Sequence, residues 1–167
     1  LQLDGSSSQD VQFYKKLSEN FATAHNTKNL SDEDFQDPGA KAKFLEKLKE
    51  KASRINVGDP MDKATHMGPQ VSEEQLSRIK SYVDVAQKEG ATILAGGESP
   101  KLEGAFQKGY FFQPTIFSDV NNQMRVAQEE IFGPVVSVIT FRDEDDLIKQ
   151  ANDTIYGLSA GIWTRDI

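Results

Sequence analysis

Apolar residues recur at steps of three or four along much of the chain, the spacing that lines one face of a helix. This pattern predicts helices at residues 44–54, 72–90 and 143–157, with one or two further helical turns at 122–129. Ser72 and Asp143 are placed to cap the second and third helices, and Gly90 to end the second. The side chain of Gln75 is expected to reach back to Ser72 and complete a capping box.

Two of these helices have an apolar face that we expect to be buried, as in other helices that pack on a globular core. In the second helix this face consists of Leu76, Ile79, Val83 and Ala86. In the third helix it consists of Leu147, Ala151 and Ile155.

Short apolar runs bounded by glycine, proline or polar residues indicate strands. They occur at residues 91–95, 113–117, 135–141 and 158–164, and a polar connection separates the first two. Because apolar strands alternate with amphipathic helices, the predicted fold class is α/β, with a largely parallel sheet flanked by helices.

Residues 1–43 differ in composition from the rest of the chain. A helix is predicted where apolar residues recur at Val11, Tyr14, Leu17, Phe21 and Ala24, and a cluster of turn-forming residues follows it. We interpret residues 1–43 as a helix and a loop, in part disordered, and residues 44–167 as the regular domain.

The net charge of the chain indicates which classes of binding partner are unfavourable. The chain has 19 basic and 26 acidic residues and a net charge of −7, which disfavours general binding to nucleic acids or anionic membranes. No stretch approaches the roughly 18 unbroken apolar residues of a membrane-spanning helix, and the first residues lack the pattern of a secretion signal. We therefore expect a cytoplasmic protein that binds neither nucleic acid nor membrane.

Residue types missing from the sequence exclude several kinds of chemistry. The chain has no cysteine and only two histidines, His25 and His66. A cysteine nucleophile and a thiolate metal site are therefore excluded, and a multi-histidine metal site is not expected. The sequence also has neither the glycine-rich dinucleotide fingerprint nor a phosphate-binding loop.

The stretch Glu-Glu-Ile-Phe-Gly-Pro-Val at residues 129–135 is the strongest candidate for a binding site. It joins a predicted helical turn to a predicted strand, a place where α/β proteins commonly bind ligands. Gly133 and Pro134 would make a stiff turn that holds Phe132 outside regular structure. The ring offers a stacking face and a neighbouring carboxylate accepts hydrogen bonds from a vicinal diol, so a planar ligand with hydroxyl groups would fit. A buried phenylalanine beside a helix-terminal glutamate is the alternative.

At this stretch the chain resembles the aldehyde dehydrogenase family, whose catalytic domain carries the same signature. Further stretches are similar to the family in order and spacing, so that the resemblance covers about residues 44–167. They are Gly58 to Pro60, Met67 to Val71, Glu89 to Gly97, Gly109 to Thr115 and Ala151 to Ala160. The resemblance implies a partial aldehyde dehydrogenase catalytic domain.

The resemblance also implies an activity and four cofactor-binding residues. The family oxidises aldehydes to carboxylic acids with NAD or NADP, through a cysteine nucleophile and a glutamate that activates water. By this match Glu130 would hold the hydroxyls of the nicotinamide-side ribose, and Phe132 would pack near the nicotinamide ring. Gln75 and Arg78 fall on helix positions that approach the same ribose in some family members.

The chain differs from the family in that the parts that carry the catalytic residues are not found in its sequence. In the family, the Rossmann-type cofactor domain, the catalytic cysteine, the general-base glutamate and the oxyanion-hole asparagine precede the helix that begins here near Phe44. Residues 1–43 resemble none of these parts, and family chains continue beyond the position of Ile167. We therefore expect an isolated chain that has no catalytic residues, is inactive, and binds NAD or NADP weakly or not at all.

The expectation about partners also follows from the family parts that this sequence does not contain. A sheet without its adjoining elements exposes apolar faces and strand edges, so we expect self-association or a complementary chain. The competing hypothesis is a non-catalytic binding or interaction module that keeps the scaffold, with residues 1–43 as a segment that binds a partner.

Overall fold

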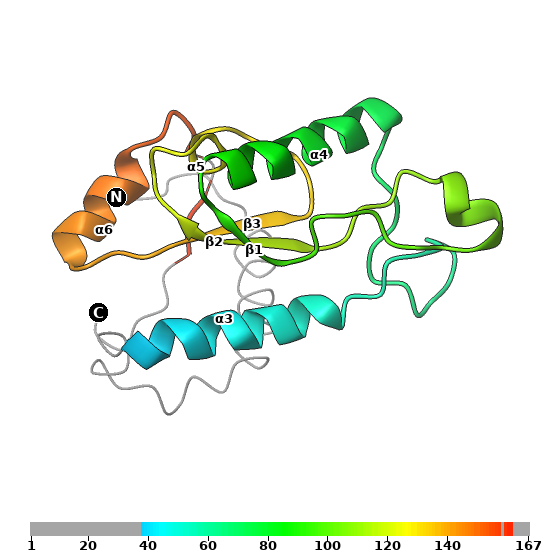
Figure 1. The fold of residues 1–167 in the computed structure, drawn as a ribbon, viewed down its shortest axis with the longest axis horizontal. Helices are drawn as coiled ribbons and strands as arrows, with labels where there is room; N and C mark the ends of the chain where they lie inside the picture. Colours follow the sequence, from blue (N-terminus) through cyan, green and yellow to red (C-terminus); the bar gives the residue numbers. More distant parts are fainter. Residues whose placement is uncertain (1–37, 158, 162–167) are drawn as a thin grey trace, which may run out of the picture. The chain divides into compact units, whose positions relative to one another are not determined.

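The computed structural model describes residues 38–157 and 159–161. The elements follow one another as α3 (Pro38–Ser53), α4 (Glu73–Lys88), β1 (Thr92–Ala95), the 3-10 helix η2 (Gly104–Lys108), β2 (Thr115–Val120), α5 (Arg125–Gln128), β3 (Val135–Ile139) and α6 (Glu144–Asn152) (Figure 1). Every element from α4 onward belongs to one compact unit of the chain, Leu45–Ile167.

The described sheet has three strands in the order β1-β2-β3. β1 pairs antiparallel with β2, and β2 pairs parallel with β3, so this sheet is mixed rather than largely parallel. The connections explain the difference. The stretch between β1 and β2 contains only η2 and reverses the chain, whereas the stretch with α5 carries the chain back to a parallel neighbour. Sequence patterns show which segments are strands, but they do not show how a polar connection directs the next strand.

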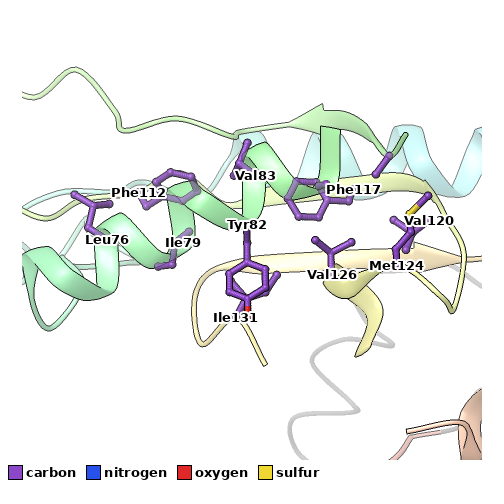
Figure 2. Packing of buried hydrophobic residues seen from close by; sticks show 12 residues of the cluster. Leu76, Ile79, Tyr82, Val83, Phe112, Phe117, Val120, Met124, Val126 and Ile131 are labelled. Carbon is purple, nitrogen blue, oxygen red and sulfur yellow. The ribbon is translucent and has the colours of Figure 1, made fainter. Parts of the chain in front are cut away.

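α4 builds the core together with the central strand. Its predicted apolar face is buried and consists of Leu76, Ile79, Val83 and Ala86. These side chains form one cluster with Tyr82 of α4, Phe117 of β2 and Val126 of α5 (Figure 2). α4 and α5 contact each other and lie on the same face of the sheet (Figure 1). Burial of each large apolar side chain stabilises the fold by about 1.5–3 kcal/mol, so this cluster fixes α4 on the sheet.

Both ends of α4 are formed by the predicted residues. The hydroxyl of Ser72 accepts a hydrogen bond from the backbone amide of Gln75 at 3.1 Å, as an N-cap residue does. Beyond the C-cap residue Glu89, the chain turns away at Gly90 with a φ of 95°, a left-handed conformation that glycine adopts without strain.

α6 forms as predicted, but its apolar face is not buried. Asp143 caps the helix, since its carboxylate accepts from the backbone amide of Asp146 at 2.8 Å. Leu147, Ala151 and Ile155 are nevertheless exposed, and Ile155 lies beyond the end of the helix. The expectation of burial is therefore wrong for the described structure. A periodic pattern identifies the apolar face of a helix but not whether another element covers it.

Several element boundaries differ from those expected. α3 begins at Pro38, before the predicted start near Phe44, because proline fits the first position of a helix, where its missing N–H has no partner to lose. η2 lies in the connection that was expected to be irregular. The helix expected over Val11 to Ala24 lies outside the described residues. So does most of the strand expected at 158–164, and residues 159–161 have no regular structure.

None of the helices in the described part of the chain has the length and apolar character needed to cross a bilayer.

Candidate functional site

The 129–134 segment, which links α5 to β3, contains the candidate residues. Glu129 is the C-cap residue of α5, and Ile131 is buried in the core cluster. Between and beyond these two anchors, Glu130 is exposed and Phe132 is 71% exposed. The segment is therefore fixed at Ile131 and presents a carboxylate and an aromatic ring to solvent.

Phe132 has a left-handed backbone conformation with a φ of 55°. This conformation costs an L-residue about 1–2 kcal/mol, so surrounding contacts must maintain it. The next residue, Gly133, lies so close to the helix that an added Cβ would come within 2.6 Å of Ile79 Cδ1. The carbonyl oxygen of Pro134 accepts a hydrogen bond from the amide of Thr115 in β2 at 2.8 Å. The turn is thus attached to α4 and to the central strand.

Gln75 binds this turn rather than its own helix cap. Its side-chain Nε2 donates to the carbonyl oxygen of Phe132 at 2.7 Å and to that of Ile131 at 3.1 Å. The expected reciprocal half of the capping box is therefore not formed, although Ser72 does accept from the Gln75 backbone amide. Two backbone carbonyls of the turn lie within reach of this amide group and accept its hydrogen bonds.

Two further side chains on the same face of α4 continue this contact. Arg78 donates from Nη2 to the carbonyl oxygen of Glu130 at 3.0 Å. Tyr82 donates from its hydroxyl to Oε2 of Glu129 at 2.7 Å. Positions separated by three and four residues lie on one side of a helix. We call Gln75, Arg78 and Tyr82 the α4 ridge, and it holds four consecutive residues of the segment.

Glu129 is the electrostatic centre of the contact. Arg125 donates to both of its carboxylate oxygens, from Nε at 2.8 Å and from Nη2 at 2.9 Å. These bonds, followed by that from Tyr82, lower the pKa of Glu129 from 4.5 to about 2. The same bond to the carboxylate, helped by burial, raises the pKa of Tyr82. The guanidinium carbons of Arg78 and Arg125 lie 5.8 and 5.7 Å from the centre of the tyrosine ring, within the range of cation–π contacts.

A cavity of about 370 Å³, open to solvent, lies beside the segment. This volume falls within the range of about 300–1,000 Å³ that is typical of ligand pockets. It is lined by Val126, Ala127, Glu129, Glu130, Ile131, Phe132, Gly133, Val135, Ser137 and Ile139. No group of three or more potential metal ligands occurs among the residues that the structure describes.

The structure brings the four candidate residues together. Glu130 and Phe132 line the cavity, while Gln75 and Arg78 reach the backbone of the segment that carries them. The alternative of a buried phenylalanine is wrong, because Phe132 is 71% exposed. An exposed carboxylate next to an exposed ring can accept hydrogen bonds from a diol and stack on a planar group. That these four residues bind a cofactor stays a prediction.

Sequence reasoning missed Glu129, Arg125 and Tyr82. A signal for the ion pair was present, since Arg125 and Glu129 lie four residues apart, the spacing of helical ion pairs. For Tyr82 the only signal was its position four residues after Arg78 on the same helix, and nothing in that spacing identifies Glu129 as its partner.

Comparisons with known proteins agree on one family. The model of the aldehyde dehydrogenase family matches residues 37–167. A betaine aldehyde dehydrogenase of Brucella anthropi is 50% identical over 133 residues, which make up 80% of this chain and 27% of that protein. A betaine aldehyde dehydrogenase of Brucella ovis is 47% identical over the same length and shares. The chain thus spans about a quarter of the length of these relatives.

Solved structures give the same result. The betaine aldehyde dehydrogenase of Staphylococcus aureus in complex with NAD+ superposes with a TM-score of 0.73 at 42% identity, over 77% of this chain and 25% of that one. The aldehyde dehydrogenase of Mycobacterium tuberculosis, also complexed with NAD+, gives a TM-score of 0.71 at 40% identity, over 75% of this chain and 25% of that one.

Proposed function

Because the chain belongs to the aldehyde dehydrogenase family, we propose that it supplies the nicotinamide-ribose corner of an NAD- or NADP-dependent enzyme that oxidises aldehydes to carboxylic acids. One observation carries this proposal. Glu130 and Phe132 are both exposed, and both residues line the same cavity. The solved relatives that contain NAD+ support the choice of cofactor.

The residues present fit the nicotinamide half of such a cofactor. Glu130 would accept hydrogen bonds from the two ribose hydroxyls, and Phe132 would pack on the nicotinamide ring. Gln75 and Arg78 would support this site through their bonds to the backbone carbonyls of residues 130–132. The bound cofactor would accept the hydride in the oxidation.

The reaction also needs groups that this chain does not have. The sequence has no cysteine, so the nucleophile that attacks the aldehyde must come from another chain or from another part of a longer protein. We therefore propose that the isolated chain forms no NADH from an aldehyde. Betaine aldehyde belongs among the substrates to be tested, because the similar Brucella proteins carry its name. Turnover that persists after removal of contaminating enzymes would contradict the proposal.

Two halves of the cofactor provide a sharp test of the site. Nicotinamide mononucleotide contains the ribose and ring that Glu130 and Phe132 would contact, whereas adenosine monophosphate has a ribose diol of the same kind but carries adenine in place of the nicotinamide ring. Titrated separately into the isotope-labelled chain, the first should shift the backbone amide signals of residues 130–133 at millimolar concentration, since a few contacts barely offset the entropy lost on binding. The second should shift these signals less, because it has no nicotinamide ring for Phe132 to contact. Equal shifts with both nucleotides, or none with either, would overturn the proposal.

We further propose that the surface around β3 and α6 contacts a partner, either a second copy of the chain or a complementary chain. Exposed apolar side chains support this, because large apolar patches on soluble proteins commonly mark interfaces. They include Val136, Phe141, Ile148 and Ile155. In sedimentation velocity the chain should form species heavier than the 18.6 kDa monomer, and Ile148→Asp should reduce them. A clean monomer at high concentration would contradict this.

A further inference from the structure

Phe132 poses a structural question that the proposed function leaves open. Its backbone is left-handed, with a φ of 55°, although its ring is 71% exposed. Packing of the ring therefore does not hold the backbone in this uncommon conformation. Strained conformations persist only where neighbouring contacts determine them, and they concentrate at binding and catalytic sites. The contact that maintains this one must act on the backbone.

The carbonyl groups on either side of Phe132 identify that contact. In an extended chain, successive carbonyls point to opposite sides, whereas in helical conformations of either hand they point the same way. Here the carbonyl oxygens of Ile131 and Phe132 both accept from the single Nε2 of Gln75, at 3.1 and 2.7 Å. One donor group that bonds to both oxygens therefore excludes the extended conformation at Phe132.

The residues on either side of Phe132, Ile131 and Gly133, are both held in place. Ile131 is buried in the core, and Gly133 lies against Ile79, where an added Cβ would meet Cγ1 at 2.7 Å. Both neighbours of Phe132 are therefore anchored to the core and to α4, which limits the conformations that place its carbonyl within reach of Gln75. Gln75 itself is half-buried in the first turn of α4, with its backbone amide bound to Ser72. The backbone from which its side-chain donor extends is therefore fixed at the start of α4.

We propose that Gln75 is a positioning residue, whose side-chain amide holds Phe132 in the left-handed conformation and so directs its ring into the cavity. Arg78, which bonds to the carbonyl of Glu130, continues the same support by one residue. The consequence for the cofactor rests on the proposed function, but the support itself is a property of the chain without nucleotide. The two are therefore tested separately.

The test uses the full chain without nucleotide and measures φ at Phe132 by NMR. A positive φ gives a strong intraresidue NOE between the amide and α protons, and a characteristic three-bond coupling. The decisive variant is Gln75→Glu, which has nearly the same shape. At neutral pH the introduced carboxylate cannot donate and repels both carbonyls, so the left-handed signature should be lost. As the pH falls below about 4.3, the usual pKa of a glutamate, the protonated carboxyl can donate one hydrogen bond in place of two, and the signature should return in part.

Matched variants separate this role from general destabilisation. Gln87→Glu changes an exposed glutamine of the same helix and should leave the signature unchanged at every pH. Gln75→Met removes the donor without adding charge, and should lose the signature at every pH. Slow amide exchange at the core residue Val83 would show that each variant is folded, and Gln75→Met decides the matter if Gln75→Glu unfolds.

The outcomes are distinct. A left-handed signature at Phe132 that persists in folded Gln75→Met overturns the proposal, as does a wild-type chain without that signature. If the signature depends on Gln75 as described but nicotinamide mononucleotide does not bind, the positioning role stands and the proposed function fails.

Discussion

Gly133 lies at the tightest contact of the site, against the fully buried Ile79 of α4. We expect Gly133→Ala to destabilise the chain by about 1–3 kcal/mol, the usual cost of forcing an extra carbon into a packed interior. The added Cβ would stand 2.6 Å from Ile79 Cδ1, so either the side chain or the turn must move. Urea denaturation followed by circular dichroism measures the change.

Gly157 provides the matched control, because no atom of the described residues, apart from its two chain neighbours, lies within 4 Å of a Cβ added there. Gly157→Ala should alter the free energy of unfolding by no more than about 0.5 kcal/mol. Equal effects of the two substitutions would show that the turn does not pack on α4 as described.

Glu129 makes the stability of the chain depend on pH in acid. Bonds from Arg125 and then Tyr82 lower the pKa of Glu129 from 4.5 to about 2. A carboxyl whose pKa is lower in the folded state stabilises the fold above its unfolded pKa, and this contribution is lost as the pH falls toward the folded value. Wild type should therefore be more stable than Glu129→Gln at pH 6, and the difference should disappear between pH 4.5 and 2.

Urea midpoints across this pH range measure the effect. Glu103→Gln is the control, since Glu103 precedes η2 without a capping hydrogen bond from its side chain. Its midpoint should follow that of wild type throughout. A difference for Glu129→Gln that stays constant down to pH 2 would contradict the ion pair.

At the scale of elements, α4 and α6 show what a sequence pattern can and cannot predict. In α4 the cap, the end and the buried face were all predicted, because local spacing and a neighbouring sheet agree there. In α6 the cap was predicted but burial was not, because burial depends on what lies over the helix. The mixed sheet was missed for a similar reason, since the direction of β1 relative to β2 is decided by the path of an irregular connection.

In the candidate site, too, the side chains could be predicted from the sequence but their supporting contacts could not. Glu130 and Phe132 were identified from the signature, and both face the cavity. The bonds from Gln75 to two backbone carbonyls could not be predicted, because they join residues far apart in sequence and do not depend on the identity of the accepting side chains. A motif names the side chains of a site, whereas its supporting backbone contacts appear only in three dimensions.

A matched pair of isoleucines tests the contrast between the two helices. Ile79 of α4 is 0% exposed and Ile148 of α6 is 52% exposed. Ile79→Ala should cost about 2–5 kcal/mol, the usual loss for a core isoleucine. Ile148→Ala should change the free energy of unfolding by no more than about 0.5 kcal/mol. Thermal or urea denaturation at low protein concentration measures both. A large loss for Ile148→Ala would mean that the apolar face of α6 is covered.

At the scale of the whole molecule, the chain corresponds to only part of the aldehyde dehydrogenase family. It spans about a quarter of the length of its Brucella relatives. Within that quarter it has the signature, the cavity and the α4 ridge, and its sequence has no cysteine. We therefore expect binding and turnover to be separable in this protein, with weak cofactor binding by this chain and a turnover that requires groups from elsewhere.

The most direct measurement of this account is the affinity for NAD of wild type, Glu130→Gln and the control Glu103→Gln, followed by NMR titration. The account predicts millimolar binding by wild type and by the control. It predicts binding at least about tenfold weaker for Glu130→Gln, the loss expected for a hydrogen bond to a charged group. Equal affinities for all three proteins would contradict the account, because Glu130 would then not be the residue that holds the ribose.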